Sequence, residues 1–201
     1  VLIATGLYLI FFYSVGKPYE SIRAIQDQQY LGRWIRALHR YATDVMIVAT
    51  AFHVLQLLIQ GKTWGPRILP WISGVALLLL FFLSAWSGYV MVWDEHAQLL
   101  ALSGAKMLQT FGLFEELLAT AFDGSVPVNS SFFFMNLFLH VALPVGLLFG
   151  LWIHTAKISR TRWFPQRPIF LASVGSLILL ALIWPAPLAQ EANLLKLLGP
   201  I

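Results

Sequence analysis

Apolar residues gather along this chain in long uninterrupted runs rather than in the short amphipathic patterns of a water-soluble domain. Runs long enough to cross the roughly 30 Å hydrocarbon core of a bilayer occur near residues 41–60, 71–92, 132–156 and 168–186, and a shorter run occupies residues 1–13. Such runs are typical of transmembrane helices. The pattern predicts an all-α transmembrane bundle with four full spans and one helix fragment.

The polar segments between these runs predict two further helices outside the bilayer. Gly16 and Pro18 interrupt the first run, and the stretch from Tyr19 to Gln29 has the character of a short surface helix. The connection 93–131 is long for a compact membrane protein, and loops of this length usually have a task. Within it, residues 99–121 have the pattern of an amphipathic helix lying along the membrane surface.

Composition agrees with a membrane protein and narrows its chemistry. The 201 residues are 59% hydrophobic and 11% charged, and a mean hydropathy of +0.75 excludes an ordinary soluble domain. The chain has no cysteine, which excludes disulfides, iron–sulfur ligation and thioether-linked haem within these residues. The opening run is too short to span and has no starting Met, so we expect it to be the second half of a helix that begins before residue 1.

The distribution of charge predicts an orientation in the membrane. The net charge is +4, and the loops 61–70 and 157–167 carry lysine and arginine without any acid. Basic loops of this kind face the cytoplasm. The connection 93–131 instead holds five acidic residues against a single Lys106, which favours the opposite side.

Four of the five histidines recur at one interval in two of the apolar runs. His39 and His53 lie fourteen residues apart, and so do His140 and His154. An α-helix advances about 1.5 Å and 100° per residue, so each pair shares one helix face at levels about 21 Å apart. If the two helices pack side by side, His39 faces His140 near one membrane surface and His53 faces His154 near the other. Two imidazoles at each level are a complete axial set for low-spin haem iron.

These histidines also admit interpretations other than haem ligation. A lone histidine in an apolar helix is more often a hydrogen-bonded core residue than a ligand, but ionisable groups at membrane depth are costly and tend to mark functional sites. Zinc is disfavoured because each level offers only two imidazoles. Gly74 and Gly88 are also fourteen residues apart. Glycine can simply allow close helix packing, but the shared interval indicates a helix that passes the edge of a flat group at each level.

Three stretches of the sequence resemble helices of cytochrome b from the quinol-oxidising cytochrome bc complexes. The stretch LGRWIRALH that ends at His39, followed by His53-Val, resembles that family's second helix. The third helix is matched by Pro66-Arg67 with Trp71 and Gly74, and by Gly88-Tyr89 with Trp93. The fourth helix is matched by His140-Val-Ala-Leu-Pro144 with His154.

The resemblance implies two b-type haems, one on His39 and His140 toward the outer side and one on His53 and His154 toward the inner side. The family's first helix also has paired glycines, and Gly6 resembles the second of them. Further contacts to the haems follow from the same comparison. Arg36 matches an arginine that pairs with a haem propionate, although a lipid-headgroup anchor is the alternative, and Lys62 is a candidate substitute for a family arginine that is replaced here by Gln56.

Two departures from the family pattern concern the quinol-oxidation pocket. The stretch Met91-Val92-Trp93-Asp94-Glu95 lacks the proline that the family has before its tryptophan, and the family's Pro-Glu-Trp-Tyr motif is absent from these 201 residues. Candidate quinone-site residues remain on both sides of the membrane: Trp93, Asp94 and Glu95 where the third span emerges, and Lys157, Ser159 and Arg160 after the last histidine. A carboxylate beside the imidazole of His96 could relay protons, but we favour the interpretation of Asp94, Glu95 and His96 as a solvated helix end.

We therefore expect a four-helix di-haem bundle over residues 1–157, with an incomplete first helix, followed by a loop, a fifth transmembrane helix and the start of another loop over 158–201. The predicted function is that of a di-haem b-type cytochrome subunit, which carries electrons between a quinone site and redox partners. Those partners, implied by resemblance only, are an iron–sulfur protein and a cytochrome c or another redox subunit. The expected setting is a multi-subunit complex in an energy-conserving membrane, such as the bacterial inner membrane. The main alternative is a cytochrome b anchor that links a dehydrogenase or reductase to the quinone pool, and a third class is a transporter or structural membrane protein.

Overall fold

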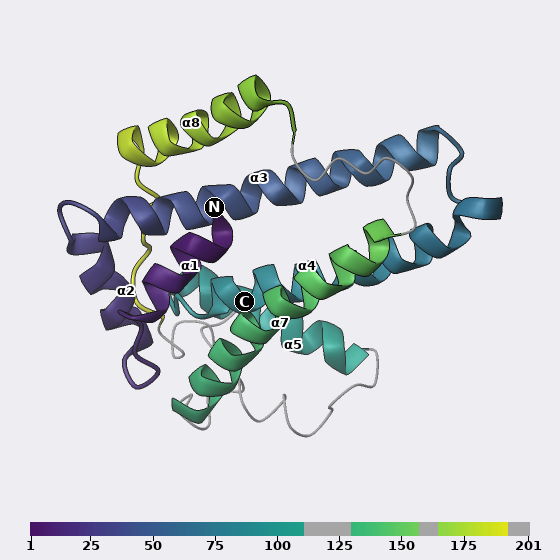
Figure 1. Ribbon diagram of the computed structural model, residues 1–201. Helices are drawn as coiled ribbons and strands as arrows, with labels where there is room; N and C mark the ends of the chain where they lie inside the picture. The colour runs from purple at the N-terminus through teal and green to yellow at the C-terminus, as the bar shows by residue number, and fades with distance from the viewer. Residues whose placement is uncertain (111–129, 157–164, 193–201) are drawn as a thin grey trace.

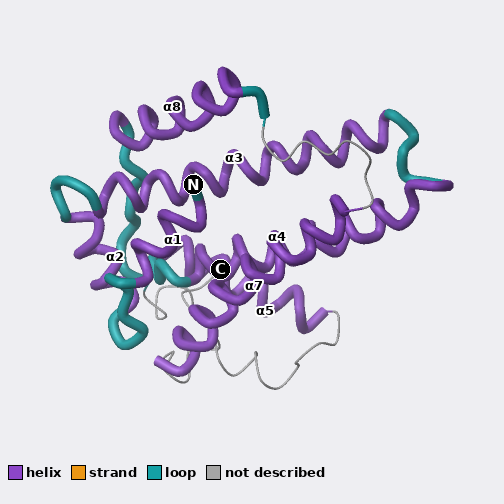
Figure 2. Tube along the Cα trace, viewed as in Figure 1, coloured by secondary structure: helices purple, strands orange, loops and turns teal. Residues whose placement is uncertain are grey.

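The computed structural model describes residues 1–110, 130–156 and 165–192, and all of its regular elements in these ranges are helical (Figures 1 and 2). These elements are, in chain order, α1 (Leu2–Ile10), α2 (Pro18–Asp27), α3 (Gly32–Ile59), the 3-10 turn η1 (Gly65–Arg67), α4 (Ile68–Val90), α5 (Glu95–Thr110), α7 (Ser130–Ala156) and α8 (Arg167–Ile183).

Three of these helices, α3, α4 together with η1, and α7, are long and apolar enough to cross a membrane. The sequence predicted a fourth full span over 168–186, but α8 has only 17 residues, because it ends at Ile183 and Pro185 disfavours helical structure for Trp184. The helix remains apolar and reaches the lower end of the length that spans a bilayer, about 17 residues. The integral-membrane class is thus confirmed. Among the described helices three are long and apolar enough to count as full spans, and α8 is a shorter apolar helix whose crossing of the membrane stays a prediction.

Local sequence accounts for most helix boundaries. Pro18 occupies the first turn of α2, where its missing N–H is harmless. Gly61 ends α3 with a φ of 63°, a left-handed conformation that glycine adopts without steric cost. The surface helix expected at 19–29 is found as α2, and the amphipathic helix expected at 99–121 begins earlier, at Glu95, with its described part ending at Thr110.

The extensive helix contacts fall into two groups. Helices α1, α2 and α8 pack on α3, whereas α5 and α7 pack on α4. Figure 1 shows α8 alongside α3, and α7 crossing α4 on the other side of the molecule. Two clusters of buried residues lie at these contacts: Ala37, Ala181 and Ala186 join α3 to the segment around α8, and Val90, Ala101 and Ala105 join α4 to α5.

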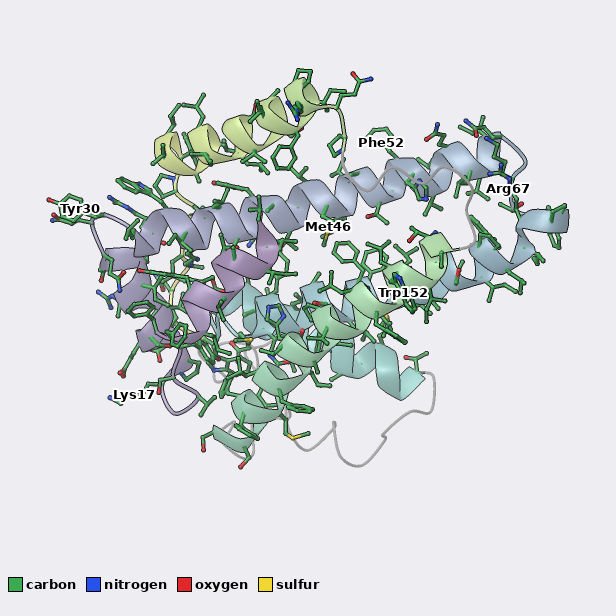
Figure 3. The ribbon with its side chains drawn as sticks, in the orientation of Figure 1. Lys17, Tyr30, Met46, Phe52, Arg67 and Trp152 are labelled. Carbon is green, nitrogen blue, oxygen red and sulfur yellow. The ribbon has the colours of Figure 1, made fainter. Side chains whose placement is uncertain are left out.

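Much of the apolar surface faces outward. Only 6% of the most apolar window of α3 is buried inside the chain, and 11% of that of α7. Phe52 on α3 is 68% exposed and Trp152 on α7 is 58% exposed (Figure 3). Since apolar helices with so little burial are stable only in apolar surroundings, lipid or other apolar partners must cover these faces.

The segment after α8 connects the two groups of helices. Tyr19 and Tyr41 donate hydrogen bonds to the carbonyls of Ala189 and Trp184, at 3.0 and 2.7 Å. On the other group, the Glu95 N–H donates to Gln190 at 3.0 Å and Trp93 accepts from Ala192 at 3.2 Å. A further link joins Tyr13 to the Met91 carbonyl at 3.1 Å.

Asp94 is the N-cap of α5 and an anchor for that same segment. Its Oδ1 accepts from the Ala97 N–H at 2.9 Å and its Oδ2 from the Ala189 N–H at 3.3 Å, and the residue is only 8% exposed. Asp94 is therefore not at a solvated helix end, which the sequence had favoured, but at a buried junction.

We predict that Asp94→Ala lowers the stability of the protein by about 1–2 kcal/mol, because it removes an N-cap and leaves buried N–H donors without an acceptor. The check is the thermal unfolding midpoint of the purified protein in detergent. Asp27→Ala is the matched control, since the Asp27 carboxylate is 72% exposed and lies 3.9 Å from Arg23; its midpoint should stay at the wild-type value. Equal midpoints for the two variants would contradict the anchoring role.

Candidate functional site: paired imidazoles between two helix groups

The structure brings His39 and His140 together from different helix groups, as the spacing predicts. His39 lies on α3 and His140 on α7, and their ring centroids are 6.2 Å apart with the planes at 73°. At the other level, His53 lies on α3 with an exposed side chain and His154 lies on α7, and their pairing stays a prediction. The His39–His140 pair thus lies between the two helix groups.

The imidazole nitrogen Nδ1 is hydrogen-bonded in three of these histidines. His39 Nδ1 lies 2.8 Å from the Thr5 hydroxyl on α1, and His154 Nδ1 lies 2.8 Å from the Ser73 hydroxyl on α4. His140 Nδ1 lies 2.9 Å from the carbonyl oxygen of Ser84 and 3.2 Å from the Ser87 hydroxyl, both on α4. Each ring is therefore held by a helix other than its own.

The direction of these hydrogen bonds follows from what the hydroxyls do elsewhere. Thr5 lies 3.0 Å from the Leu2 carbonyl, Ser73 lies 3.1 Å from that of Pro70, and Ser87 lies 2.9 Å from that of Ser84. A hydroxyl has one proton, and carbonyls only accept. The hydroxyls therefore donate to their own helices and accept from the rings.

The same contacts fix the tautomer of each ring. A ring whose Nδ1 carries the proton presents an unprotonated Nε2, which is the form that ligates a metal. At His140 the Ser84 carbonyl requires the same protonation of Nδ1 without any hydroxyl. All three rings are thus prepared as Nε2 ligands.

Three glycines lie against the imidazole rings, next to the Cε1 atoms. A Cβ added to Gly88 would lie 2.5 Å from His140 Cε1, and one added to Gly74 would lie 3.2 Å from His154 Cε1. On α1, a Cβ on Gly6 would come within 3.3 Å of His39 Cε1. A side chain at any of these three positions would therefore meet a histidine ring, and the expected role of the glycines at the edge of a flat group stays a prediction.

These features fit a haem iron better than an isolated metal ion. Metal–imidazole bonds are about 2.0–2.1 Å long, so one ion between two rings separates the nitrogens by about 4 Å and the centroids by more, which agrees with 6.2 Å. Within the described ranges no group of three or more His, Cys, Asp or Glu could hold a metal ion. A pair of imidazoles alone suits an ion whose other ligands come from a macrocycle.

Asn136 supports His140 from one turn earlier on α7. Its Nδ2 donates to the Ser87 carbonyl at 2.8 Å, and the residue is only 3% exposed. Asn136 and His140 therefore bind the same turn of α4, which fixes the register between the two helices.

Arg36 and Lys62, the two cations expected near haem propionates, differ in their surroundings. The Arg36 guanidinium donates to Gln26 Oε1 and the Ala186 carbonyl, both at 2.7 Å, and to the Pro187 carbonyl at 3.2 Å. It thus ties α3 to α2 and to the segment after α8. Lys62 is half-buried in the loop between α3 and η1. The propionate role of both residues stays a prediction.

The candidate quinone residues on the third span lie at the junction with the segment after α8. Trp93 has a φ of 53°, a left-handed conformation that is unusual for a bulky residue. Its ring packs 5.0 Å from that of Phe133, and both line a cavity of about 190 Å³ with Glu191 and residues 15–20. Asp94 and Glu95 hold the chain at this point, and a quinone role for them stays a prediction. Lys157, Ser159 and Arg160 lie outside the described residues.

A cluster of charged residues that the sequence analysis missed joins α3 to α4. Tyr89 donates to Asp44 Oδ1 at 2.6 Å, and the other carboxylate oxygen of Asp44 lies 3.1 Å from Arg40. The Arg40 guanidinium also stacks 4.2 Å over the Tyr89 ring. Since Tyr89 follows Gly88 and Arg40 follows His39, these contacts link the two helix groups beside the His39–His140 pair.

The hydroxyl partners of the imidazoles were missed as well, although the sequence carries a signal for them. Thr5, Ser73 and Ser87 each stand immediately before one of the glycines Gly6, Gly74 and Gly88. A hydroxyl residue followed by glycine at the haem interval could therefore have identified them.

Comparisons with known proteins agree with this geometry. The family model for cytochrome b/b6/petB matches residues 1–162. The cytochrome b6 of Heliobacterium modesticaldum is 26% identical over 153 residues, which are 72% of this chain and 70% of that one. The menaquinol:cytochrome c reductase cytochrome b subunit of Bacillus subtilis is 25% identical over 152 residues, or 74% and 68% of the two chains.

A solved structure shares the fold. A chain of a hyperthermophilic respiratory complex III superposes with a TM-score of 0.71 at 18% identity; the match covers 96% of this chain and 60% of that one. The family model alone covers the whole stretch from α1 to the end of α7, including all four paired histidines. The chain therefore belongs to the cytochrome b/b6 family.

Proposed function

We propose that this chain is the di-haem b-type cytochrome subunit of a quinol-oxidising or quinone-reducing membrane complex. The observation that carries the proposal is the set of imidazoles whose Nδ1 atoms are held by Thr5, Ser73 and the Ser84 carbonyl, since this leaves Nε2 available to iron. His39 and His140 would hold one haem, and His53 and His154 the other. Haem iron with two imidazole ligands supplies one-electron transfer without binding oxygen.

The chain contributes position and surroundings to this reaction. Helices α3, α4 and α7 fix the two sites in line across the membrane, because each ligand pair recurs after about four helical turns. Apolar side chains keep the interior at low dielectric, so the two ends are electrically separated. Charge that moves between them is coupled to the membrane potential at about 2.3 kcal/mol per charge per 100 mV.

Family membership supports a quinone as the small-molecule partner, and the names of the relatives support a multi-subunit complex. In this proposal the His39–His140 level lies on the outer side, near Trp93, Asp94 and Glu95, and the basic loops 61–70 and 157–167 face the cytoplasm of a bacterial inner membrane. The expected protein partners are an iron–sulfur protein and a cytochrome c or other redox subunit, and the electron path runs from the outer to the inner level.

A second candidate is a cytochrome b anchor that serves a dehydrogenase or reductase without a bifurcating quinol site. It is favoured by Val92, which stands where the family has proline, and by the segment 189–192, which is hydrogen-bonded across Trp93, Asp94 and Glu95. An inhibitor of quinol oxidation discriminates the two, because it blocks electron entry at the outer haem only where a working pocket exists there.

The assignment of ligands is tested by His53→Ala, for which we expect the purified complex to lose one of two b-type haems. The measurement is a reduced-minus-oxidised spectrum with redox titration, and one remaining potential is expected. His96→Ala is the matched control, because His96 is exposed at the start of α5 and should leave both haems in place. A wild-type complex without a b-type band would contradict the proposal, and so would full haem content in His53→Ala.

The glycine positions give a further prediction. Gly88→Ala should weaken binding of the haem at the His39–His140 level by about 10- to 100-fold, the usual effect of disturbing an outer contact of a metal site, since the new Cβ would displace the His140 ring. Haem content per chain measures this loss. Gly146→Ala on α7 is the control, because an added Cβ there meets nothing within 4 Å. Equal haem content in the two variants would contradict the close fit at Gly88.

A further inference from the structure

The three hydroxyl–glycine pairs are one repeated device. In each pair the glycine lies at Cε1 of an imidazole and the preceding hydroxyl residue lies at Nδ1 of the same ring. Consecutive residues on a helix are about 100° apart, so one dipeptide reaches two neighbouring atoms of a ring. The glycine sets how closely the ring approaches, and the hydroxyl sets its rotation and tautomer.

The device is not equivalent at the three rings. Thr5 and Ser73 are the hydrogen-bond partners that the structure gives to Nδ1 of His39 and His154, each at 2.8 Å. His140 has two partners, and the nearer one is the Ser84 carbonyl at 2.9 Å, ahead of the Ser87 hydroxyl at 3.2 Å. A side-chain substitution can remove the first two contacts but cannot remove a backbone carbonyl.

We infer that Thr5 and Ser73 are positioning residues that set the redox potentials of the two haems separately, Thr5 through His39 and Ser73 through His154. An acceptor on Nδ1–H makes the imidazole a more basic ligand, and a more basic ligand stabilises ferric over ferrous iron. Loss of the acceptor therefore raises the midpoint potential of the haem that the ring holds. Ser87 has a smaller influence, because the Ser84 carbonyl continues to hold His140.

The hydrogen bonds also set the angle between the ligand planes. His39 is held from α1 and His140 from α4, and their planes are at 73°. Release of His39 by loss of the Thr5 hydroxyl frees its ring to rotate about Nε2. The anisotropy of the low-spin ferric signal depends on this angle, so it reports the change independently of the potential.

The experiment compares Thr5→Val, Ser73→Ala and Ser87→Ala in the purified complex, with the midpoint potential of each haem and its ferric electron paramagnetic resonance spectrum as readouts. Thr5→Val keeps the shape of the side chain and removes the hydroxyl. It should raise only the potential of the His39–His140 haem, by about 59 mV for a tenfold change in the ferric–ferrous ratio. Ser73→Ala should raise only the other potential by a similar amount, and Ser87→Ala should shift neither by more than a small fraction of that.

Conservative variants separate positioning from a general structural effect. Thr5→Ser and Ser73→Thr retain a hydroxyl and should restore wild-type potentials. If Thr5→Val does not assemble, Thr5→Cys replaces the hydroxyl by a weaker acceptor and should give a smaller rise at the same haem. The Ser73 variants report on the second haem independently of Thr5.

This inference rests on the proposed function, and the outcomes distinguish the two. Absence of b-type haem from the wild type, or full haem content in His53→Ala, overturns the proposed function. Two bound haems with unchanged potentials in Thr5→Val and Ser73→Ala overturn the positioning role alone. It is also overturned if each substitution moves both potentials equally, or if Ser87→Ala moves its haem as far as Thr5→Val does.

Discussion

The orientation of the imidazole rings is the constraint on which the rest of the structure depends. A histidine on an apolar helix can rotate and can carry its proton on either nitrogen, so its position alone does not make it a ligand. Here the Thr5 and Ser73 hydroxyls and the Ser84 carbonyl accept from Nδ1 and fix both choices. Because these acceptors lie on α1 and α4 while the histidines lie on α3 and α7, the helices must pack as they do for the site to exist.

The arrangement of the bundle follows from this requirement. The helices form two groups, around α3 and around α4, and the extensive contacts lie within the groups. Between them stand the His39–His140 pair, the Arg40–Asp44–Tyr89 cluster and the segment after α8. Charged and polar contacts thus hold the groups at a set spacing, and the apolar faces between and around them remain for cofactor, lipid and neighbouring subunits. This division suits a scaffold that carries flat cofactors between helices rather than a protein with one continuous core.

Much of this could be predicted from the sequence, and the failures have a common cause. The apolar runs located α3, α4 and α7, because the length of a run of consecutive apolar residues shows directly whether a helix can cross the hydrocarbon core. The interval of fourteen predicted that His39 and His140 face each other, because helical periodicity is a local property, and their ring centroids lie 6.2 Å apart. By contrast, the end of α8 moved from 186 to Ile183 through the effect of Pro185, and Asp94 proved to be a buried anchor rather than a solvated end. Arg36 reaches carbonyls at 186 and 187, which no local pattern indicates.

The sequence by itself determined the class of the protein, the spacing of the four histidines and the glycines that accompany them, since each depends on residues within one helix. The tertiary structure decided which atoms hold each ring. Thr5 is 34 residues from His39, and Ser73 is 81 residues from His154, so their meeting depends on how α1, α3, α4 and α7 cross. Hydrogen bonds require a distance near 3 Å and a set direction, and only the packing of whole helices fixes both.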